Sequence, residues 1–305
     1  MKKKWIVTTA IVLALAGTGV ACREQIKPYM TRILFGISDY FRDRGLESPA
    51  GIVRIDDQVY GTDKMQVFDV YYPEGTDGPL PTIVSIHGGG YTYGDKELYQ
   101  YYCMDLARRG FAVVNFSYRL APEHKFPAPL EDLNSVMWYV CADAVKYHVD
   151  TENIFFVGDS AGAHLNAQYT TAVSNPEYAA RLSLQIPSFT LRATALNCGL
   201  YRAEDLEGNT SYYLAKGQDL GDLDMHAYIT DKFPPAYVMS GTEDFALPYA
   251  EPMAAFLKEK GVECELHIFG DEQTKAPHVF HLNMKSALAD QCNDAECAFF
   301  RAYSR

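Results

Sequence analysis

The chain has 305 residues, of which 48% are hydrophobic and 22% charged, and its formal net charge is −12. This composition is typical of a globular protein with a sizeable core. The acidic balance disfavours a nucleic-acid partner, because a phosphate backbone is bound mainly through Lys and Arg. Length alone suggests about two domains of roughly 150 residues each, although some folds form one larger unit.

The sequence pattern of the first residues is typical of a targeting segment. Lys2–Lys4 precede Trp5–Ala21, a run of 17 residues without charge. A basic start, an apolar stretch and small residues before a cut are signal-peptide features, and 17 residues lie at the short limit for a spanning helix. We therefore expect residues 1–21 to be a signal peptide or membrane anchor that places the rest outside the cytoplasm, because the lysines stay inside.

Cys22 raises a third possibility for the N-terminus, that of a lipoprotein. A small residue, Ala21, precedes it, as at lipoprotein processing sites, although Gly19 stands where such sites usually carry leucine. An even count of cysteines then remains and permits disulfides, with the two nearest the C-terminus forming the single close pair. We expect these six to be free, buried apolar residues. They are Cys103, Cys141, Cys198, Cys264, Cys292 and Cys297.

Short apolar runs alternate with helical patterns along the rest of the chain. This alternation predicts crossover units and a mostly parallel sheet. Strands are expected near residues 66–72, 82–86, 111–116, 153–157, 195–200, 236–240 and 264–269. Helices are expected over 96–109, 129–147, 161–174 and 248–260.

The second of these strands ends in His87 and three glycines. Acyl transfer creates an oxyanion that needs preorganised donors, and glycines leave backbone amides bare. Gly88 and Gly89 could supply two such amides, and Ala161 a third. The run lacks the spacing of a phosphate-binding loop or a dinucleotide fingerprint. His87 is interpreted as a hydrogen-bonding residue that shapes the loop.

A buried run, Ile154–Val157, leads directly into Gly158-Asp159-Ser160-Ala161-Gly162. The Gly-x-Ser-x-Gly pattern after a strand predicts a nucleophile elbow, in which small residues on both sides allow a sharp strand-to-helix turn. Ser160 is therefore the predicted nucleophile. Without the glycine loop before it, the same serine would equally suit an ordinary helix cap.

A serine hydroxyl needs a base to become a nucleophile, and in this architecture the acid and then the histidine follow in the sequence. Asp244 comes just after the 236–240 strand and is the predicted acid. His278 follows the 264–269 strand in a loop and is the predicted base.

Each of these two assignments has competitors. Glu243 is the alternative acid, and His281 or the in-strand His267 is the alternative base. No metal and no cofactor are expected, because His-Glu-x-x-His and paired Cys-x-x-Cys patterns are absent from the sequence, and His278 with His281 is only half of a site.

Together these motifs resemble the bacterial hormone-sensitive-lipase-like esterases of the α/β-hydrolase superfamily. Tyr118–Ala128 also resembles a family segment, and the likeness runs from about residue 66 to the end. It implies an α/β-hydrolase fold, with a mostly parallel sheet flanked by helices and a small helical cap. Ser160, Asp244 and His278 fall at the family's triad positions, and Gly88, Gly89 and Ala161 fall at its oxyanion positions.

Two positions depart from the family pattern. Val279 stands where a glycine usually follows the catalytic histidine. Phe245-Ala246-Leu247 follows the acid in place of a leucine-type residue and polar ones. Neither departure removes a predicted catalytic group, but each could alter access to the site and substrate choice.

The resemblance also divides the chain. Residues 22–50 would form an N-terminal cap segment, and residues 51–305 the catalytic domain, with a cap insertion at about 201–232. Tyr212 and Tyr213 of the cap insertion are candidate pocket walls, and so is Tyr91, which directly follows the glycine run.

The expected function is that of a serine carboxylesterase acting on small esters with short to medium acyl chains. One alternative is an amidase or peptide-releasing hydrolase on the same triad. Another is a non-catalytic ligand-binding protein on a hydrolase scaffold. Fold-level analogy cannot rank substrates, since one fold hosts many chemistries.

Overall fold

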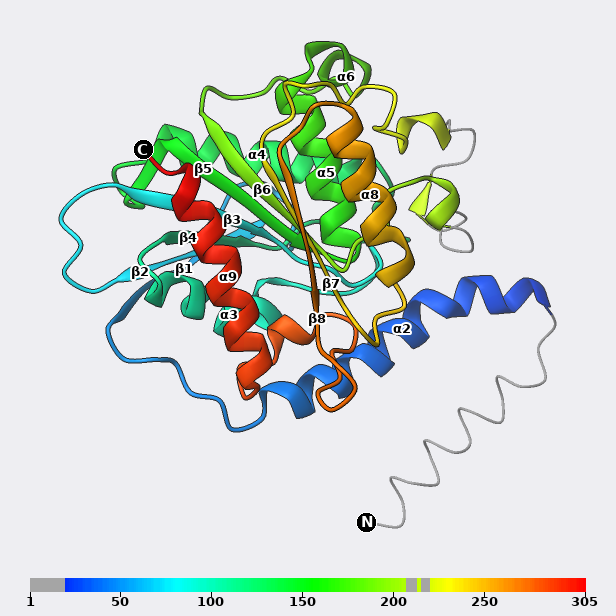
Figure 1. Ribbon diagram of the computed structural model, residues 1–305, viewed down its shortest axis with the longest axis horizontal. Coiled ribbons are helices and arrows are strands. Elements are labelled where there is room, and N and C mark those ends of the chain that lie inside the picture. Colours follow the sequence, from blue (N-terminus) through cyan, green and yellow to red (C-terminus); the bar gives the residue numbers. More distant parts are fainter. Residues whose placement is uncertain (1–19, 207–212, 215–219) are drawn as a thin grey trace.

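The computed structural model describes residues 20–206, 213–214 and 220–305 (Figure 1). Its centre is one sheet of eight strands in the order β1-β2-β4-β3-β5-β6-β7-β8. The first two strands pair antiparallel, as do β2 and β4, and all other neighbours are parallel. The strands are β1 Ile52–Val59, β2 Val67–Pro73, β3 Leu80–Ile86, β4 Ala112–Phe116, β5 Val149–Asp159, β6 Leu191–Asn197, β7 Ala236–Gly241 and β8 Cys264–Phe269.

Helices cover both faces of the sheet, as the fold class predicted from the sequence requires. They are α2 Val20–Asp43, α3 Lys96–Arg108, α4 Ala128–Ala142, α5 Ala161–Ser174, α6 Pro176–Arg181, α8 Leu247–Glu259 and α9 Ala287–Tyr303. Short 3-10 turns lie at η1 Glu204–Leu206, η2 Leu220–Asp222 and η3 Phe280–Leu282.

Two apolar clusters, one on each face of the sheet, make up the core. Alternate strand residues enter opposite clusters, so that Val84 and Phe156 pack with α4, α5 and α8, while Ile83 and Phe155 pack with α3 and α9 (Figure 1). This explains the continuous apolar sequence of β5, because a parallel strand in the middle of a sheet is buried on both sides.

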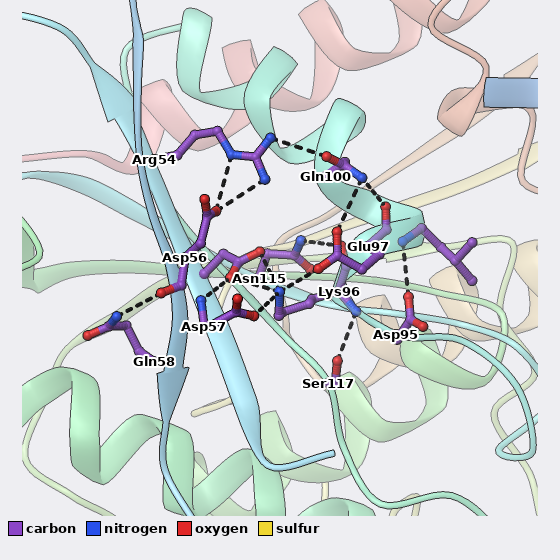
Figure 2. Close-up of polar contacts among 12 residues, drawn as sticks. Arg54, Asp56, Asp57, Gln58, Asp95, Lys96, Glu97, Gln100, Asn115 and Ser117 are labelled. Atoms are coloured by element: carbon purple, nitrogen blue, oxygen red, sulfur yellow. Dashed lines mark hydrogen bonds and ion pairs between the residues drawn. The ribbon is translucent and has the colours of Figure 1, made fainter. Parts of the chain in front are cut away.

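The antiparallel edge of the sheet is held to α3 by a buried lysine. The Lys96 ammonium, 4% exposed, lies 2.9 Å from Asp57, 3.0 Å from Asp69 and 2.6 Å from Glu97 (Figure 2). Burial lowers the pKa of Lys96, but the three carboxylates outweigh burial and raise it. Asn115 donates to the Lys96 carbonyl, so that β1, β2, β4 and α3 are joined at one point. A buried charge without such partners would be strongly destabilising.

The N-terminal helix α2 lies outside the two helical layers, and its amino-terminal end extends past the rest of the domain (Figure 1). The targeting segment predicted for residues 1–21 falls almost entirely outside the described residues. Within the part of the chain that the structure describes, no helix combines the length and the apolar character needed to cross a membrane.

Candidate active site

The parallel strands bring the predicted residues to one edge of the sheet. The glycine run follows β3, Ser160 follows β5, Asp244 follows β7 and His278 follows β8. The carboxyl ends of parallel strands meet at the same edge, which is where ligands bind in open α/β sheets.

Ser160 occupies a strained turn between β5 and α5. Its φ of 53° and ψ of −119° lie outside the regions that non-glycine residues prefer, at a cost on the order of 1–3 kcal/mol. A Cβ on Gly158 would lie 2.4 Å from the Gly162 carbonyl oxygen, and a Cβ on Gly162 would lie 2.1 Å from that of Ile86. Both glycines are therefore required by close backbone approach, and the turn leaves Ser160 on the wall of a cavity.

His278 and Asp244 form a direct pair. The Nδ1–H of His278 donates to Oδ1 of Asp244 at 2.6 Å. The carboxylate also accepts the Ala246 amide at 2.8 Å and the Ser240 hydroxyl at 2.9 Å. Burial raises the pKa of Asp244, but the hydrogen bond and charge of His278 outweigh it and lower the pKa to about 2. Asp244 therefore stays ionised and fixes the tautomer and orientation of the imidazole.

The competing residues have other contacts. Glu243 is half-exposed and pairs with Lys275, and His267 pairs with Glu265 on its own strand. His281 is 1% exposed, and neither ring nitrogen has a hydrogen-bond partner in the described structure. Burial lowers the pKa of His281 to about 3. None of these three side chains forms a hydrogen bond with Asp244 or lines the cavity that contains Ser160.

The two departures from the family pattern lie beside His278. Val279 has φ 52°, in the left-handed region that favours glycine and strains a β-branched residue. The ring of Phe245 lies 4.1 Å from the His278 ring and is 63% exposed. Ala246 supplies the amide that contacts Asp244. The altered sequence therefore covers the histidine with an aromatic ring at the cavity mouth.

Cys198 lies close to Asp244, a contact that the sequence did not indicate. Donor atoms of Cys198, Asp244 and His278 are within 4.8 Å of one another. Such a trio could hold a metal by atom type, but the Nδ1 of His278 is already committed to Asp244. The other described cysteines lie elsewhere, and all six are unbridged; five are buried and Cys141 is partly exposed.

The glycine loop differs from the prediction at its first member. The Gly88 amide donates to the Tyr99 hydroxyl at 2.8 Å, so it is already paired in this arrangement, although Gly88 and Tyr99 both line the cavity. Gly89 and Gly90 line the cavity, and their amides form no hydrogen bond within the described chain. Ala161 begins α5, so its N–H has no acceptor inside the helix. The open amides at this site are therefore those of Gly89, Gly90 and Ala161.

A set of aromatic contacts shapes this loop from behind. His87 donates through Nδ1 to the Gly88 carbonyl at 2.8 Å and stacks on Tyr118 with a centroid distance of 3.9 Å. The Tyr118 hydroxyl donates to the His87 carbonyl at 2.8 Å. Burial lowers the pKa of His87 to about 4, so the ring is neutral at pH 7. The Tyr118–Ala128 segment thus supports the loop, and His87 has the shaping role predicted for it.

Asp159, the residue before Ser160, is buried, and its pKa is shifted from the ordinary value of an aspartate. Its Oδ2 accepts the Tyr99 hydroxyl at 2.8 Å, so Tyr99 links Gly88 to Asp159. Burial raises the pKa of Asp159 to about 7, opposed by the Tyr99 hydrogen bond. The sequence gives no signal for Tyr99, because this residue lies inside the helical pattern of α3 and belongs to no motif.

Asp159→Asn should change how stability depends on pH. The unfolded pKa is about 4, below the folded value, so the folded state holds the extra proton and the wild type loses stability as pH rises from about 4 to 7. The difference in free energy of unfolding, variant minus wild type, should therefore be larger at pH 8 than at pH 5, by on the order of a few kcal/mol. Urea unfolding at both pH values measures this.

Comparing the variant with wild type at each pH removes the contribution of the buried histidines, which titrate in the same window with the opposite sign. Asp77→Asn, at an exposed loop position, is the control and should show no such difference. An Asp159→Asn variant that kept the wild-type pH slope would contradict the assignment.

The predicted tyrosines have different positions. Tyr91 lines the cavity, and its hydroxyl lies 3.0 Å from His164. Tyr213 does not line it but stacks behind Tyr91, with ring centroids 3.7 Å apart. Tyr212 lies outside the described residues. Of the predicted cap insertion, only residues 201–206, 213–214 and 220–232 are described, and Leu206 lines the cavity.

The cavity has a volume of about 360 Å³ and opens between the catalytic edge and α2. Its walls are mainly apolar, with a few polar groups from the helix. The helix supplies Lys27, Thr31, Phe35, Ser38, Asp39 and Arg42, and the loops supply Leu200, Leu206, Phe245 and Leu282. Helix α2, most of which belongs to residues 22–50, therefore forms one wall of the cavity.

The fold and this site together define an α/β hydrolase. The family model described as alpha/beta hydrolase fold matches residues 83–282, which is more than half of the chain. The chain belongs to this family, and the family resemblance drawn from the motifs is confirmed.

Several curated proteins and solved structures are similar. The chain is 28% identical to Carboxylesterase NlhH of Mycobacterium tuberculosis over 74% of this chain and 77% of that one. It is 25% identical to Esterase LipC of the same organism, over 62% of this chain but only 51% of that protein. Esterase B from Lactobacillus rhamnosis, solved with a tributyrin phosphonate inhibitor, has a TM-score of 0.86 at 20% identity, covering 94% of this chain and 96% of that one.

Proposed function

We propose that the protein is a carboxylic ester hydrolase that works through Ser160, His278 and Asp244. The observation that carries this proposal is the 2.6 Å His278–Asp244 pair, in the same cavity as a serine on a strained elbow. The names of the relatives, carboxylesterases and esterases, support the same reaction class.

In this mechanism Ser160 Oγ attacks the ester carbonyl while His278 takes its proton through Nε2. Asp244, ionised and buried, stabilises the imidazolium that forms. The tetrahedral oxyanion is held by the amides of Ala161, Gly89 and Gly90. His278 then gives the proton to the departing alkoxide, and a covalent acyl-enzyme remains. Water, deprotonated by the same histidine, releases the acid and restores Ser160.

The cavity supports small substrates. Its volume of about 360 Å³ lies at the small end of ligand sites, and its apolar walls suit an acyl chain. We propose short- to medium-chain acyl esters as substrates. An amide would need better protonation of its leaving group than an ester does.

The test is a series of 4-nitrophenyl esters from acetate to decanoate, beside the matching 4-nitroanilides. We expect kcat/KM to be highest between four and eight acyl carbons and to fall at decanoate, with the anilides at least 10³-fold slower, an order-of-magnitude expectation for a site that relies on a good leaving group. Faster anilide hydrolysis would favour the amidase. A folded protein inert to both series would favour the binding-protein alternative.

We also propose export, with the N-terminal segment either cleaved or retained as a membrane tether. The uncharged Trp5–Ala21 run behind three lysines supports this. The mass of the mature N-terminus distinguishes the forms, since a lipid on Cys22 marks a lipoprotein and an intact Met1 marks an uncleaved anchor.

A further inference from the structure

Helix α2 turns an apolar face to the solvent. Six large side chains on it are about half exposed or more, with no charged residue among them. Their spacing of three, four and seven residues places them along one side of the helix. They are Tyr29, Ile33, Leu34, Ile37, Tyr40 and Phe41, exposed by 48%, 55%, 59%, 53%, 62% and 62%. We refer to these six residues as the outer face of α2.

The opposite side of α2 is polar and contacts the domain. Arg32 donates to the carbonyls of Thr92 at 2.7 Å and Ala121 at 2.9 Å, and pairs with Glu123 at 2.6 Å. Further along, Arg42 donates to the Leu98 carbonyl at 2.8 Å. A surface helix normally buries its apolar stripe and exposes its charges, and here the two are exchanged. These polar contacts fix the helix so that its apolar side cannot turn inward.

The sequence just before α2 indicates what covers this face. The uncharged run Trp5–Ala21 leads directly into the helix, which begins at Val20. A chain tethered to a bilayer at that point holds the first turns of α2 at the lipid surface. Tyr29 and Tyr40 suit the headgroup level, where amphipathic aromatic rings are enriched.

The cavity lies directly behind the outer face, on the domain-facing side of α2. Thr31, Phe35 and Ser38 of α2 form part of the cavity wall, and the exposed ring of Phe245 lies at its opening. A helix lying along a bilayer by its outer face would therefore hold the cavity one helix diameter, roughly 10 Å, from the lipid.

We propose that the outer face of α2 docks on a lipid bilayer, so that the enzyme takes ester amphiphiles that partition into the membrane. The substrate half of this proposal rests on the proposed function, and the docking half does not. Apolar burial drives the docking, because a net charge of −12 gives no general attraction to anionic lipid. High salt should therefore leave it intact.

The docking half is tested with the full chain in phosphatidylcholine vesicles that contain brominated acyl chains, which quench nearby tryptophan. Ile37→Trp places a probe on the outer face. Val145→Trp, at a 92% exposed site in the turn before β5, is the matched control. Relative to the parent chain, we expect the added fluorescence at position 37 to fall by at least half and that at position 145 to be unchanged. Equal quenching at both positions would overturn the proposal.

The substrate half is tested with a triple variant, Ile33→Ser, Ile37→Ser and Phe41→Ser, none of which lines the cavity. Hydrolysis of a monoacylglycerol carried in the same vesicles should fall at least fivefold, while hydrolysis of soluble 4-nitrophenyl acetate should not change. The control is Val59→Ser with Val145→Ser, at exposed sites away from α2. An equal loss on both esters, or on neither, would overturn the substrate half.

Two further outcomes are decisive. If the triple variant converts a dimer to a monomer and position 37 is not quenched, the outer face is an interface between two copies and the proposal is wrong. Because quenching needs no catalysis, a wild type that is quenched at position 37 but hydrolyses neither ester would refute the proposed function and still support docking.

Discussion

Ser160→Ala should lower kcat for 4-nitrophenyl butyrate by at least about 10⁴-fold, with little change in KM. In the proposed mechanism the Ser160 Oγ forms the acyl-enzyme, and the substitution removes that atom while the alanine keeps the elbow geometry. The oxyanion amides and His278 would remain, so a residual rate above that of water is expected. Steady-state release of 4-nitrophenolate, followed at matched protein concentration, measures the loss.

Ser38→Ala is the matched control, because Ser38 also lines the cavity but lies on α2, away from the elbow. It should keep kcat within about threefold of wild type, as a surface substitution outside the catalytic groups does. A phosphonate ester adds a second readout, since intact-protein mass should rise for wild type and Ser38→Ala only. A Ser160→Ala protein that retained wild-type turnover would remove this serine from the mechanism.

Much of the fold followed from patterns that the chain carries locally. The strand that ends at the elbow, β5, is apolar on both faces, and the strands after it recur with helices between them, so the parallel sheet was predictable. The elbow and the glycine loop were predictable for a different reason. Only glycine allows the backbone to approach as closely as Gly158 and Gly162 do.

Other features depend on tertiary contacts. Strand β1, IVRIDDQV, was missed because it is a partly exposed edge strand whose charges are explained by α3 packing beside it. The sixth strand begins at Leu191, four residues before the prediction, because its early residues are only partly buried. At the site, motif position alone favoured the Gly88 amide as an oxyanion donor. That amide is paired with the Tyr99 hydroxyl of α3, a contact that no local pattern indicates.

The orientation of α2 also depends on tertiary contacts. Its aromatic and basic residues were visible in the sequence, but periodicity cannot say which side of a helix meets the domain. The polar contacts of Arg32 and Arg42 decide that, and they leave the apolar side outside. The left-handed φ of Val279 likewise explains the glycine of related sequences only once the backbone is known.

Finally, His278→Ala should reduce kcat for 4-nitrophenyl butyrate by at least about 10⁴-fold, whereas His267→Ala should stay within about threefold of wild type. Only His278 has Asp244 on one nitrogen and a place in the cavity with Ser160. His267 pairs with Glu265 on the sheet edge, away from the nucleophile.

His281, the buried alternative to His278, requires a different measurement. His281→Asn should lower the urea midpoint, because His281 packs edge-on against Tyr102 in the core, but it should leave kcat of the folded fraction close to wild type. The two variants thus separate catalysis from packing. His278→Ala should lose turnover and keep its stability, whereas His281→Asn should lose stability and keep its turnover. A His281 variant with normal stability and lost turnover would transfer the base role to it, and the 2.6 Å His278–Asp244 pair would then have only a structural function.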